Sequence, residues 1–172
     1  GFNGGSVSVA SNGSVSLAYR PLPESYWDAS SATWSWSVQE GVPPTDLRQK
    51  GGDDRNLALY FVFLPAAEAQ ALKGASVRQL LTNDAARVLV YVWGGAHDRG
   101  AVLGSPYLGD RGRTIVLRGS GTGNANENVN LSRDYANAFG GGGAALVGLA
   151  LSGDSDDTDT RIRASISGLN IN

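Results

Sequence analysis

The segment from Ser31 to Val38 alternates polar and apolar side chains, and this alternation constrains the fold more than any other feature. Successive side chains of a β-strand point to opposite faces, so Trp34, Trp36 and Val38 share one face while serines occupy the other. Such a strand is predicted to lie at the surface of an apolar core, with its serine face toward water.

Two further segments, Leu57–Leu64 and Arg87–Trp93, are apolar on both faces. Strands of this kind are covered on each side, so both are predicted to be central strands. Near the N-terminus, Ser6–Ala10 and Gly13–Arg20 alternate small polar with apolar residues. The intervening Ser11-Asn12-Gly13 predicts a hairpin turn between them.

Helix-forming sequence is confined to two places. Ala66–Lys73 consists of strong helix formers and ends at Gly74, so one or two short helices are predicted within residues 65–84. Ser132–Phe139 is predicted to be a helix capped by Ser132 and stopped by Gly140.

The remaining segments complete a mostly β pattern. Strands are predicted at Arg113–Arg118, Ala144–Ser152 and Arg161–Ile171, and residues 119–128 are predicted to form a loop or an edge. The many short strands predict one domain, residues 1–172, with an all-β fold: an antiparallel β-sandwich of jelly-roll type with a few short helices. A closed barrel is the alternative.

Composition excludes several classes of protein. Charged residues make up 17% of the chain and the net charge is −2, so we expect no nucleic-acid partner. The chain has no cysteine for a disulfide or a thiolate, and no apolar run near the ~18 residues of a membrane helix. It begins at Gly1, for which removal of a signal peptide is one ordinary cause, so we expect a secreted or periplasmic protein without membrane insertion.

Short motifs along most of the chain carry a family resemblance. They are Trp34-Ser-Trp36-Ser-Val38, then Pro44, Asp46 and Lys50, Gly52-Asp53-Asp54, Tyr60 and Phe63, Tyr91-Val92-Trp93, Pro106-Tyr107, Arg118, Glu127 with Asn130, Asp134-Tyr135 through Phe139-Gly140, and Asp154-Ser-Asp156 with Thr158. In this order they resemble a family of secreted bacterial proteins known as domain of unknown function 3047, from Trp34 to the C-terminus.

The resemblance implies export and a compact β-rich domain, but it supplies no activity. The chain departs from the family pattern at three positions. Ala58 stands where the family often has Arg, Ser105 where it often has Asn, and Asn128 at or near an Arg position. A polar site built from those residues in the family is therefore incomplete in this chain.

Aromatic and acidic residues suggest a ligand site. Sugars stack on aromatic rings while carboxylates and amides bind their hydroxyl groups, and a β scaffold can present both. The candidate ligand-binding residues are Trp36, Trp93, Tyr107, Asp53, Asp54 and Glu127. The alternative is that the tryptophans pack in the core and that Asp53 and Asp54 cap the local turn.

The turn from Asp154 to Asp159 holds four carboxylates within six residues. Hard oxygen ligands at alternating positions suit Ca²⁺, so Asp154, Asp156 and Thr158 are the candidate metal ligands. The loop lacks the central glycine and distal glutamate of an EF-hand, so partners would come from elsewhere, with Asp53 and Asp54 as examples. A solvated acidic turn is the alternative.

Catalytic motifs are scarce. His97 is the only histidine, and no Gly-x-Ser-x-Gly elbow accompanies it, which disfavours a serine triad and a zinc site. The leading hypothesis is a non-catalytic glycan-binding domain that Ca²⁺ bound at the acidic turn would stabilise. The alternatives are a structural protein that assembles into homo-oligomers or filaments, and a carboxylate-dependent glycan hydrolase or lyase in which Asp53 or Asp54 pairs with Glu127 or Asp154.

Overall fold

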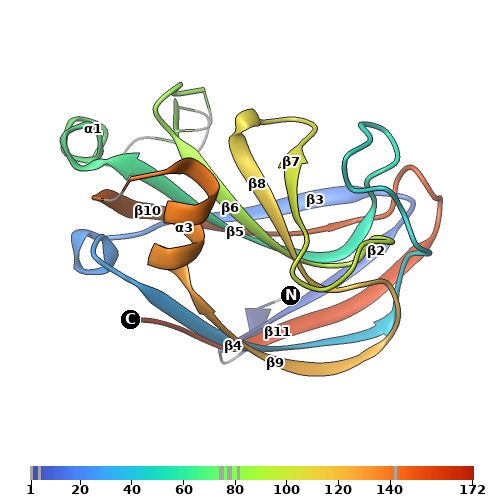
Figure 1. Cartoon of the computed structure of the whole chain (residues 1–172). Coiled ribbons are helices and arrows are strands. Elements are labelled where there is room, and N and C mark those ends of the chain that lie inside the picture. Colours follow the sequence, from blue (N-terminus) through green and yellow to red (C-terminus); the bar gives the residue numbers. More distant parts are fainter. Residues whose placement is uncertain (1, 4, 74–75, 77–78, 81, 142) are drawn as a thin grey trace.

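Two β-sheets lie face to face in the computed structural model of the chain (Figure 1), which describes all residues except 1, 4, 74–75, 77–78, 81 and 142. The five-stranded sheet contains, in spatial order, β1 (Phe2–Asn3), β2 (Ser6–Asn12), β11 (Arg161–Ile171), β4 (Ser31–Glu40) and β9 (Gly123–Asn130). The six-stranded sheet contains β3 (Val15–Pro21), β10 (Ala144–Asp154), β5 (Arg55–Pro65), β6 (Arg87–Trp93), β8 (Gly109–Arg118) and β7 (Val102–Ser105).

The predicted all-β sandwich is confirmed, with one departure from the antiparallel pattern. Strands β6 and β8 pair in parallel, and Val90 lies beside Thr114 in that register. The connection between them contains β7, which pairs antiparallel with the far side of β8 and was not predicted. The jelly-roll connectivity stays a prediction, because the strand order alone does not establish it.

The space between the sheets is filled by aromatic rings. On β4 the side chains of Trp34, Trp36 and Val38 are all buried, as the alternation predicted. The ring of Trp36 packs edge-on against Trp34 at 5.4 Å between centroids and lies 5.7 Å from Trp93. Such edge-to-face contacts add to the free energy gained by burying the rings.

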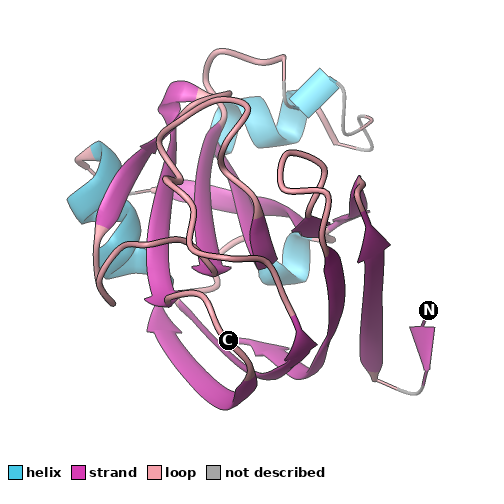
Figure 2. Ribbon diagram, turned by 90° about the vertical axis from the view of Figure 1, so that its right-hand side faces the viewer, coloured by secondary structure: helices cyan, strands magenta, loops and turns pink. Residues whose placement is uncertain are grey.

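A second apolar layer covers the outer face of the six-stranded sheet. The predicted central strands β5 and β6 lie side by side and are buried on both faces. Their outward side chains, among them Val62, Val88 and Val90, contact loops and the short helix α1 (Ala66–Ala71). Helix α1 lies on the outer face, whereas α3 (Leu131–Phe139) packs across one side of the sandwich (Figure 2), where Leu131 and Phe139 join the core between the sheets. This outer layer forms the candidate site described below.

The predicted N-terminal hairpin is wrong. Strand β2 pairs with β11 in one sheet and β3 pairs with β10 in the other, so Gly13 marks a corner between the sheets. A matching corner joins β10 to β11, and the Gly13 amide donates to the Thr160 carbonyl at 2.9 Å. The turn at Gly13 was predicted correctly, but it leads from one sheet to the other and bonds to the acidic turn.

The helices are close to their predicted positions. Helix α3 spans Leu131–Phe139, and its cap is the Asn130 side chain, which accepts a 2.8 Å hydrogen bond from the Arg133 amide, in place of Ser132. Gly140 follows the helix with φ of 72°, as a glycine stop requires. Helix α1 ends at Ala71, and the predicted stop at Gly74 lies outside the described residues. Residues 119–128 proved to contain most of edge strand β9.

Membrane-spanning helices are absent from the described part of the chain, where no helix has the length and apolar character to cross a bilayer.

Candidate functional site

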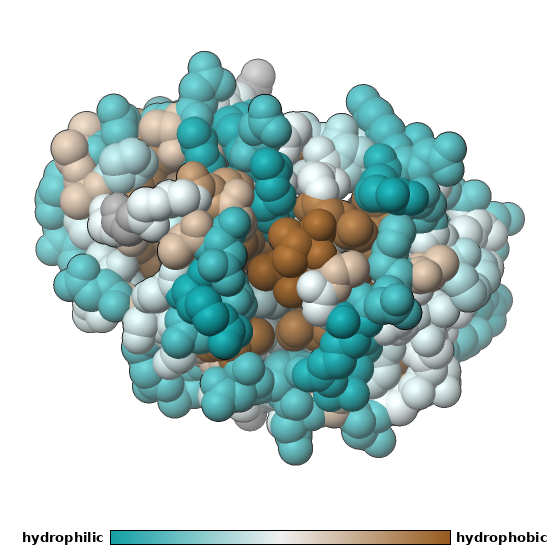
Figure 3. All heavy atoms as spheres, viewed as in Figure 1, coloured by the Kyte–Doolittle hydropathy of each residue, from teal (hydrophilic) through white to brown (hydrophobic). Residues whose placement is uncertain are grey.

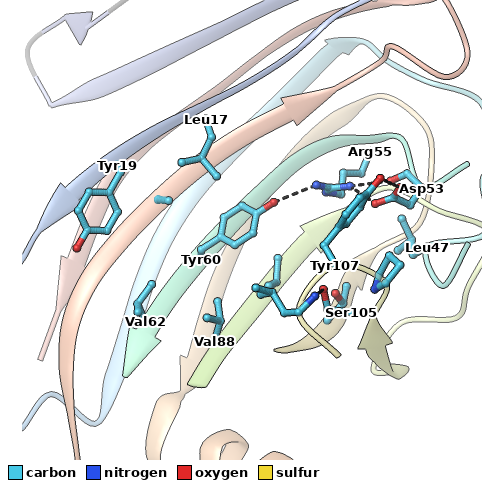
Figure 4. Close-up of a pocket in the computed structure, with 15 residues that line it drawn as sticks. Leu17, Tyr19, Leu47, Asp53, Arg55, Tyr60, Val62, Val88, Ser105 and Tyr107 are labelled. Atoms are coloured by element: carbon cyan, nitrogen blue, oxygen red, sulfur yellow. Dashed lines mark hydrogen bonds and ion pairs between the residues drawn. The ribbon is translucent and has the colours of Figure 1, made fainter. Parts of the chain in front are cut away.

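A pocket of about 230 Å³ opens on the outer face of the six-stranded sheet. Its walls come from β3, β5, β6 and the turn between β7 and β8 (Figure 4). Most of the lining is apolar, and the residues concerned are Leu17, Tyr19, Leu47, Val62, Val88, Val90, Pro106, Leu108 and Ala150. We call this the sheet pocket.

Polar groups gather at one end of the sheet pocket. Asp53, two residues before β5, accepts a 2.8 Å hydrogen bond from Arg55 through Oδ2 and a 3.0 Å hydrogen bond from the Tyr107 hydroxyl through Oδ1. Lys50 lies 5.4 Å from the centre of the Tyr107 ring. Because Tyr107 is 55% exposed while Asp53 is 3% exposed, the tyrosine is the accessible part of this pair.

Arg55 is the centre of the polar end. Its Nη1 contacts Asp53 and also lies 3.2 Å from Asp154, while its Nη2 donates to the Tyr60 hydroxyl at 3.0 Å. Tyr60 in turn lies 3.0 Å from the Ser152 hydroxyl. Burial by itself would lower the pKa of Arg55, yet Tyr60, Asp154 and Asp53 together hold it above its ordinary value. The guanidinium therefore stays charged and joins the residues before β5, strand β5 itself and the end of β10.

The pKa of Asp154 is raised, whereas an ion pair ordinarily lowers the pKa of a carboxylate. Burial raises its pKa to about 7, with further increases from Asp156 and Asp54, although Arg55 opposes them. Its Oδ1 is buried without a hydrogen-bond partner among the described residues. Burial therefore favours the protonated form of this carboxylate.

The acidic turn is held by Asp54. Its Oδ2 accepts hydrogen bonds from the Thr158 amide at 2.8 Å and from the Thr158 hydroxyl at 2.6 Å. One carboxylate oxygen from each of Asp54, Asp156 and Asp157 lies within 4.8 Å of the others. Burial, followed by the charges of Asp54 and Asp156, raises the pKa of Asp157, so the negative charge at this turn is not fully compensated.

The predicted metal ligands are only partly brought together. Asp156 joins the carboxylate group, and Asp54 and Asp157 belong to it as well. Asp154 instead bonds to Arg55, and the Thr158 hydroxyl is already used by Asp54. Carboxylate oxygens are the ligands that Ca²⁺ prefers, so the fitting set is Asp54, Asp156 and Asp157.

Three predicted ligand residues lie away from the sheet pocket. Trp36 and Trp93 are 2% and 5% exposed, so their rings face the core and offer no surface to a sugar. Glu127 is buried beside them, where its Oε1 accepts hydrogen bonds from Trp36 Nε1 at 3.1 Å and from Arg118 at 2.7 Å. The alternative interpretation of the tryptophans as core residues is therefore correct.

The remaining predicted residues converge from separate parts of the chain. Asp53 and Tyr107 meet at the sheet pocket, while Asp54 lies buried behind them against the acidic turn. Sequence reasoning missed Arg55 and Tyr60, which connect these parts. The available signal was an arginine at the start of a strand otherwise apolar on both faces.

His97 is partly buried. Its Nε2 accepts a 3.2 Å hydrogen bond from the Leu47 amide and lies 3.1 Å from Asp46. It joins two loops beside the sheet pocket.

The chain matches a known protein family over nearly its whole length. The family described as protein of unknown function, DUF3047, matches residues 3–170. The chain belongs to this family. No curated protein matches it. The motifs Gly52-Asp53-Asp54, Pro106-Tyr107 and Asp154-Ser-Asp156, on which the resemblance rested, lie around Arg55 in this structure. Ser105, one of the departures from the family pattern, lines the sheet pocket.

A cation at the acidic turn should stabilise the fold. If Ca²⁺ binds Asp54, Asp156 and Asp157, an ion concentration ~100 times its dissociation constant adds about 2.7 kcal/mol, or roughly 5–10 °C of melting temperature. Calorimetry in millimolar Ca²⁺ and in EDTA measures this shift. Asp156→Asn with Asp157→Asn should abolish it, whereas Asp98→Asn, in an exposed loop, should keep it. Identical melting curves in Ca²⁺ and EDTA would contradict cation binding and support the alternative, a solvated acidic turn.

The raised pKa of Asp154 predicts a stability that falls with pH. Between its ordinary value of 3.8 and about 7, the folded protein keeps a proton that the unfolded chain has lost, so the free energy of unfolding decreases as pH rises through that window. Urea unfolding in EDTA measures it. Asp154→Asn, which stays uncharged, should match the wild type near pH 4 and exceed its stability at pH 8 by about 1–2 kcal/mol. Parallel pH profiles for the two proteins would contradict this account.

Proposed function

We propose that this protein is a non-catalytic binding domain and that the sheet pocket is its binding site. The ligand is a small uncharged molecule with an apolar body and a hydroxyl-bearing head, as in a sugar with an aromatic or alkyl aglycone. The observation that carries the proposal is the joining of an apolar pocket to the Asp53–Tyr107 pair.

The apolar wall supports the body of such a ligand. Val88 and Val90 are only 2% and 4% exposed, yet both line the sheet pocket, so they form an apolar floor for the body of the ligand. A cavity of about 150 Å³ holds a benzene ring in other proteins. The sheet pocket, at about 230 Å³, therefore has room for one aromatic ring or a short alkyl chain.

The polar end supports a neutral head. The charge of Arg55 is balanced by Asp53 and shared with Asp154, so an ionic head would meet an already paired group. The Ser105 hydroxyl lines the pocket and accepts a 3.2 Å hydrogen bond from the Leu108 amide, so its own O–H remains available to donate. The exposed ring of Tyr107 gives a sugar a stacking surface, and its hydroxyl oxygen, which donates to Asp53, can still accept a hydrogen bond.

A hydrolase is less well supported. Asp53 and Asp154 both contact Arg55 and differ in environment, as an acid and its partner do in glycosidases. However, Asp154 does not line the sheet pocket, so a bound ligand meets only Asp53. Glu127 belongs to a separate cluster around Arg118. Binding without hydrolysis is therefore the function that this geometry favours.

Three probes separate the parts of the proposed ligand. Phenyl β-glucoside carries both an aromatic body and a sugar, glucose carries only the sugar, and benzyl alcohol carries a ring with a single hydroxyl. Isothermal titration calorimetry should rank phenyl β-glucoside above both fragments. A protein that binds glucose as tightly as phenyl β-glucoside would contradict the apolar part of the proposal, and one that binds none of the three would contradict it altogether.

A pocket-filling substitution provides the matched control. Val90 and Val92 point to the same side of β6, but only Val90 lines the sheet pocket. Val90→Phe should therefore place its ring in the pocket, change the free energy of unfolding little and block phenyl β-glucoside. Val92→Phe overpacks a buried position and should cost about 1–3 kcal/mol. Equal destabilisation by the two changes would show that the pocket is not open space.

Self-assembly is the second candidate, favoured by strand β3. Within the described strands β3 pairs only with β10, and its Val15 and Leu17 are exposed, as at an edge that could add a neighbouring strand. Strand β2 is not an edge, because it lies between β1 and β11.

Light scattering over a concentration series tests assembly. Oligomers that Val15→Lys abolishes and that persist in Val102→Lys, at the opposite edge of the same sheet, would support this second candidate. A monomer at every concentration would remove it.

A further inference from the structure

A second opening lies on another side of the molecule, between the edge strands of the two sheets. Strand β7 is the edge of one sheet and β9 the edge of the other, and residues of both line a cavity of about 480 Å³ together with helix α3. We call this the edge groove. None of the residues lining the sheet pocket lines the edge groove.

The floor of the edge groove is apolar. Ile115 and Leu117 of β8 and Val129 of β9 form it, and Val102 of β7 stands beside them, 57% exposed. Figure 3 shows an apolar area at the centre of this face, over β7 and β8 and bordered by hydrophilic residues. Strands β7 and β9 do not pair with each other, so the sandwich is open between these two edges.

Arginines stand at the rim. Arg99 donates to Glu127 Oε2 at 3.2 Å, and Arg133 contacts Asp134 Oδ1 at 3.1 Å. Both side chains are more than half exposed, at 57% and 66%, so their guanidinium groups face solvent. A guanidinium has five N–H donors, and one carboxylate occupies only some of them.

The charges around the groove do not cancel. Glu127 is bonded by Arg118 as well as by Arg99, and Arg133 faces Asp134, which also accepts a 2.9 Å hydrogen bond from Tyr91. Three guanidinium groups therefore face two carboxylates, which leaves an excess of one positive charge beside an apolar floor. Asn128 and Asn137 add exposed amides to the same lining.

We propose that the edge groove binds a small amphipathic anion, with its carboxylate against the rim arginines and its apolar chain on Ile115 and Leu117. A planar carboxylate matches the fork of N–H donors on a guanidinium and can bond to it in two places. The volume suits a chain or ring system of drug-like size. This site is independent of the ligand proposed for the sheet pocket.

Isoleucine methyl spectra localise the binding. The chain has four isoleucines, of which Ile115 is in the edge groove and the other three, Ile162, Ile166 and Ile171, lie on β11. Titration with sodium octanoate should shift the Ile115 methyl signal in a saturable way and leave the other three nearly unchanged. Shifts confined to the β11 methyls, or no saturable shift at all, would overturn the proposal.

Charge variants test the role of the rim. Arg133→Gln and Arg99→Gln should each weaken octanoate binding by roughly tenfold to a hundredfold, because a charge-assisted hydrogen bond is lost. Val102→Glu places a negative charge at the groove and should weaken binding similarly. Val15→Glu, equally exposed on the far edge of the sheet, should not. Unchanged affinity in all three groove variants would refute the electrostatic part of the proposal.

The head group is tested by two further probes. Octanol shares the chain and lacks the charge, so it should bind at least about tenfold more weakly than octanoate. Octyl phosphate should bind no more tightly than octanoate, and a clear preference for it would overturn the choice of a carboxylate. Ile115 shifts that depend on protein concentration without any probe would identify a second copy of the chain as the occupant and would also overturn the proposal.

Discussion

The need to cover strands β5 and β6 on both faces shapes the whole molecule. Their inward side chains pack against the tryptophan face of β4, which fixes the distance between the sheets. Their outward side chains form a broad apolar surface, which loops, α1 and the β7–β8 turn cover. The sheet pocket is the space left between that face and its cover, so the candidate site follows from the same pattern that builds the core.

Arg55 is a charged side chain at the end of this apolar face. A charged group at the start of a buried strand must be paired, and the guanidinium is held by Asp53, Asp154 and Tyr60. Asp53 and Tyr60 are neighbours of Arg55 in the sequence, whereas Asp154 ends the distant strand β10, so one side chain fixes the acidic turn relative to the pocket. Asp154 keeps one oxygen without a hydrogen bond among the described residues, and burial raises its pKa although Arg55 opposes that shift.

Much of the scaffold could be predicted from residue patterns. The alternation around Trp34 and Trp36, and the two apolar runs that became β5 and β6, predicted the right strands and the right faces because burial depends on a short local period. The hairpin at Gly13 failed because a glycine turn allows a corner as readily as a hairpin, and the choice depends on partners far along the chain. The parallel β6–β8 pair could not be predicted from the sequence, because it too depends on partners far along the chain.

The candidate site was only partly predictable. Asp53 and Tyr107 were identified as residue types suited to binding, but nothing local distinguishes them from Trp36, which the structure places in the core. The acidic turn was recognised by its charge density, yet Asp54 completes it from about a hundred residues away in the sequence. Which polar residues share a site depends on the pairing of segments far apart in the chain. Local residue patterns do not reveal that pairing.

The central claim is that one ligand places its apolar body on the valines of β6 and its hydroxyl head at Tyr107. Intermolecular nuclear Overhauser effects in the complex with phenyl β-glucoside test this orientation directly. The account predicts contacts from the phenyl protons to the methyl groups of Val88 and Val90, and from the sugar protons to the ring of Tyr107. Contacts in the reverse orientation, or contacts only to residues outside the sheet pocket, would contradict it.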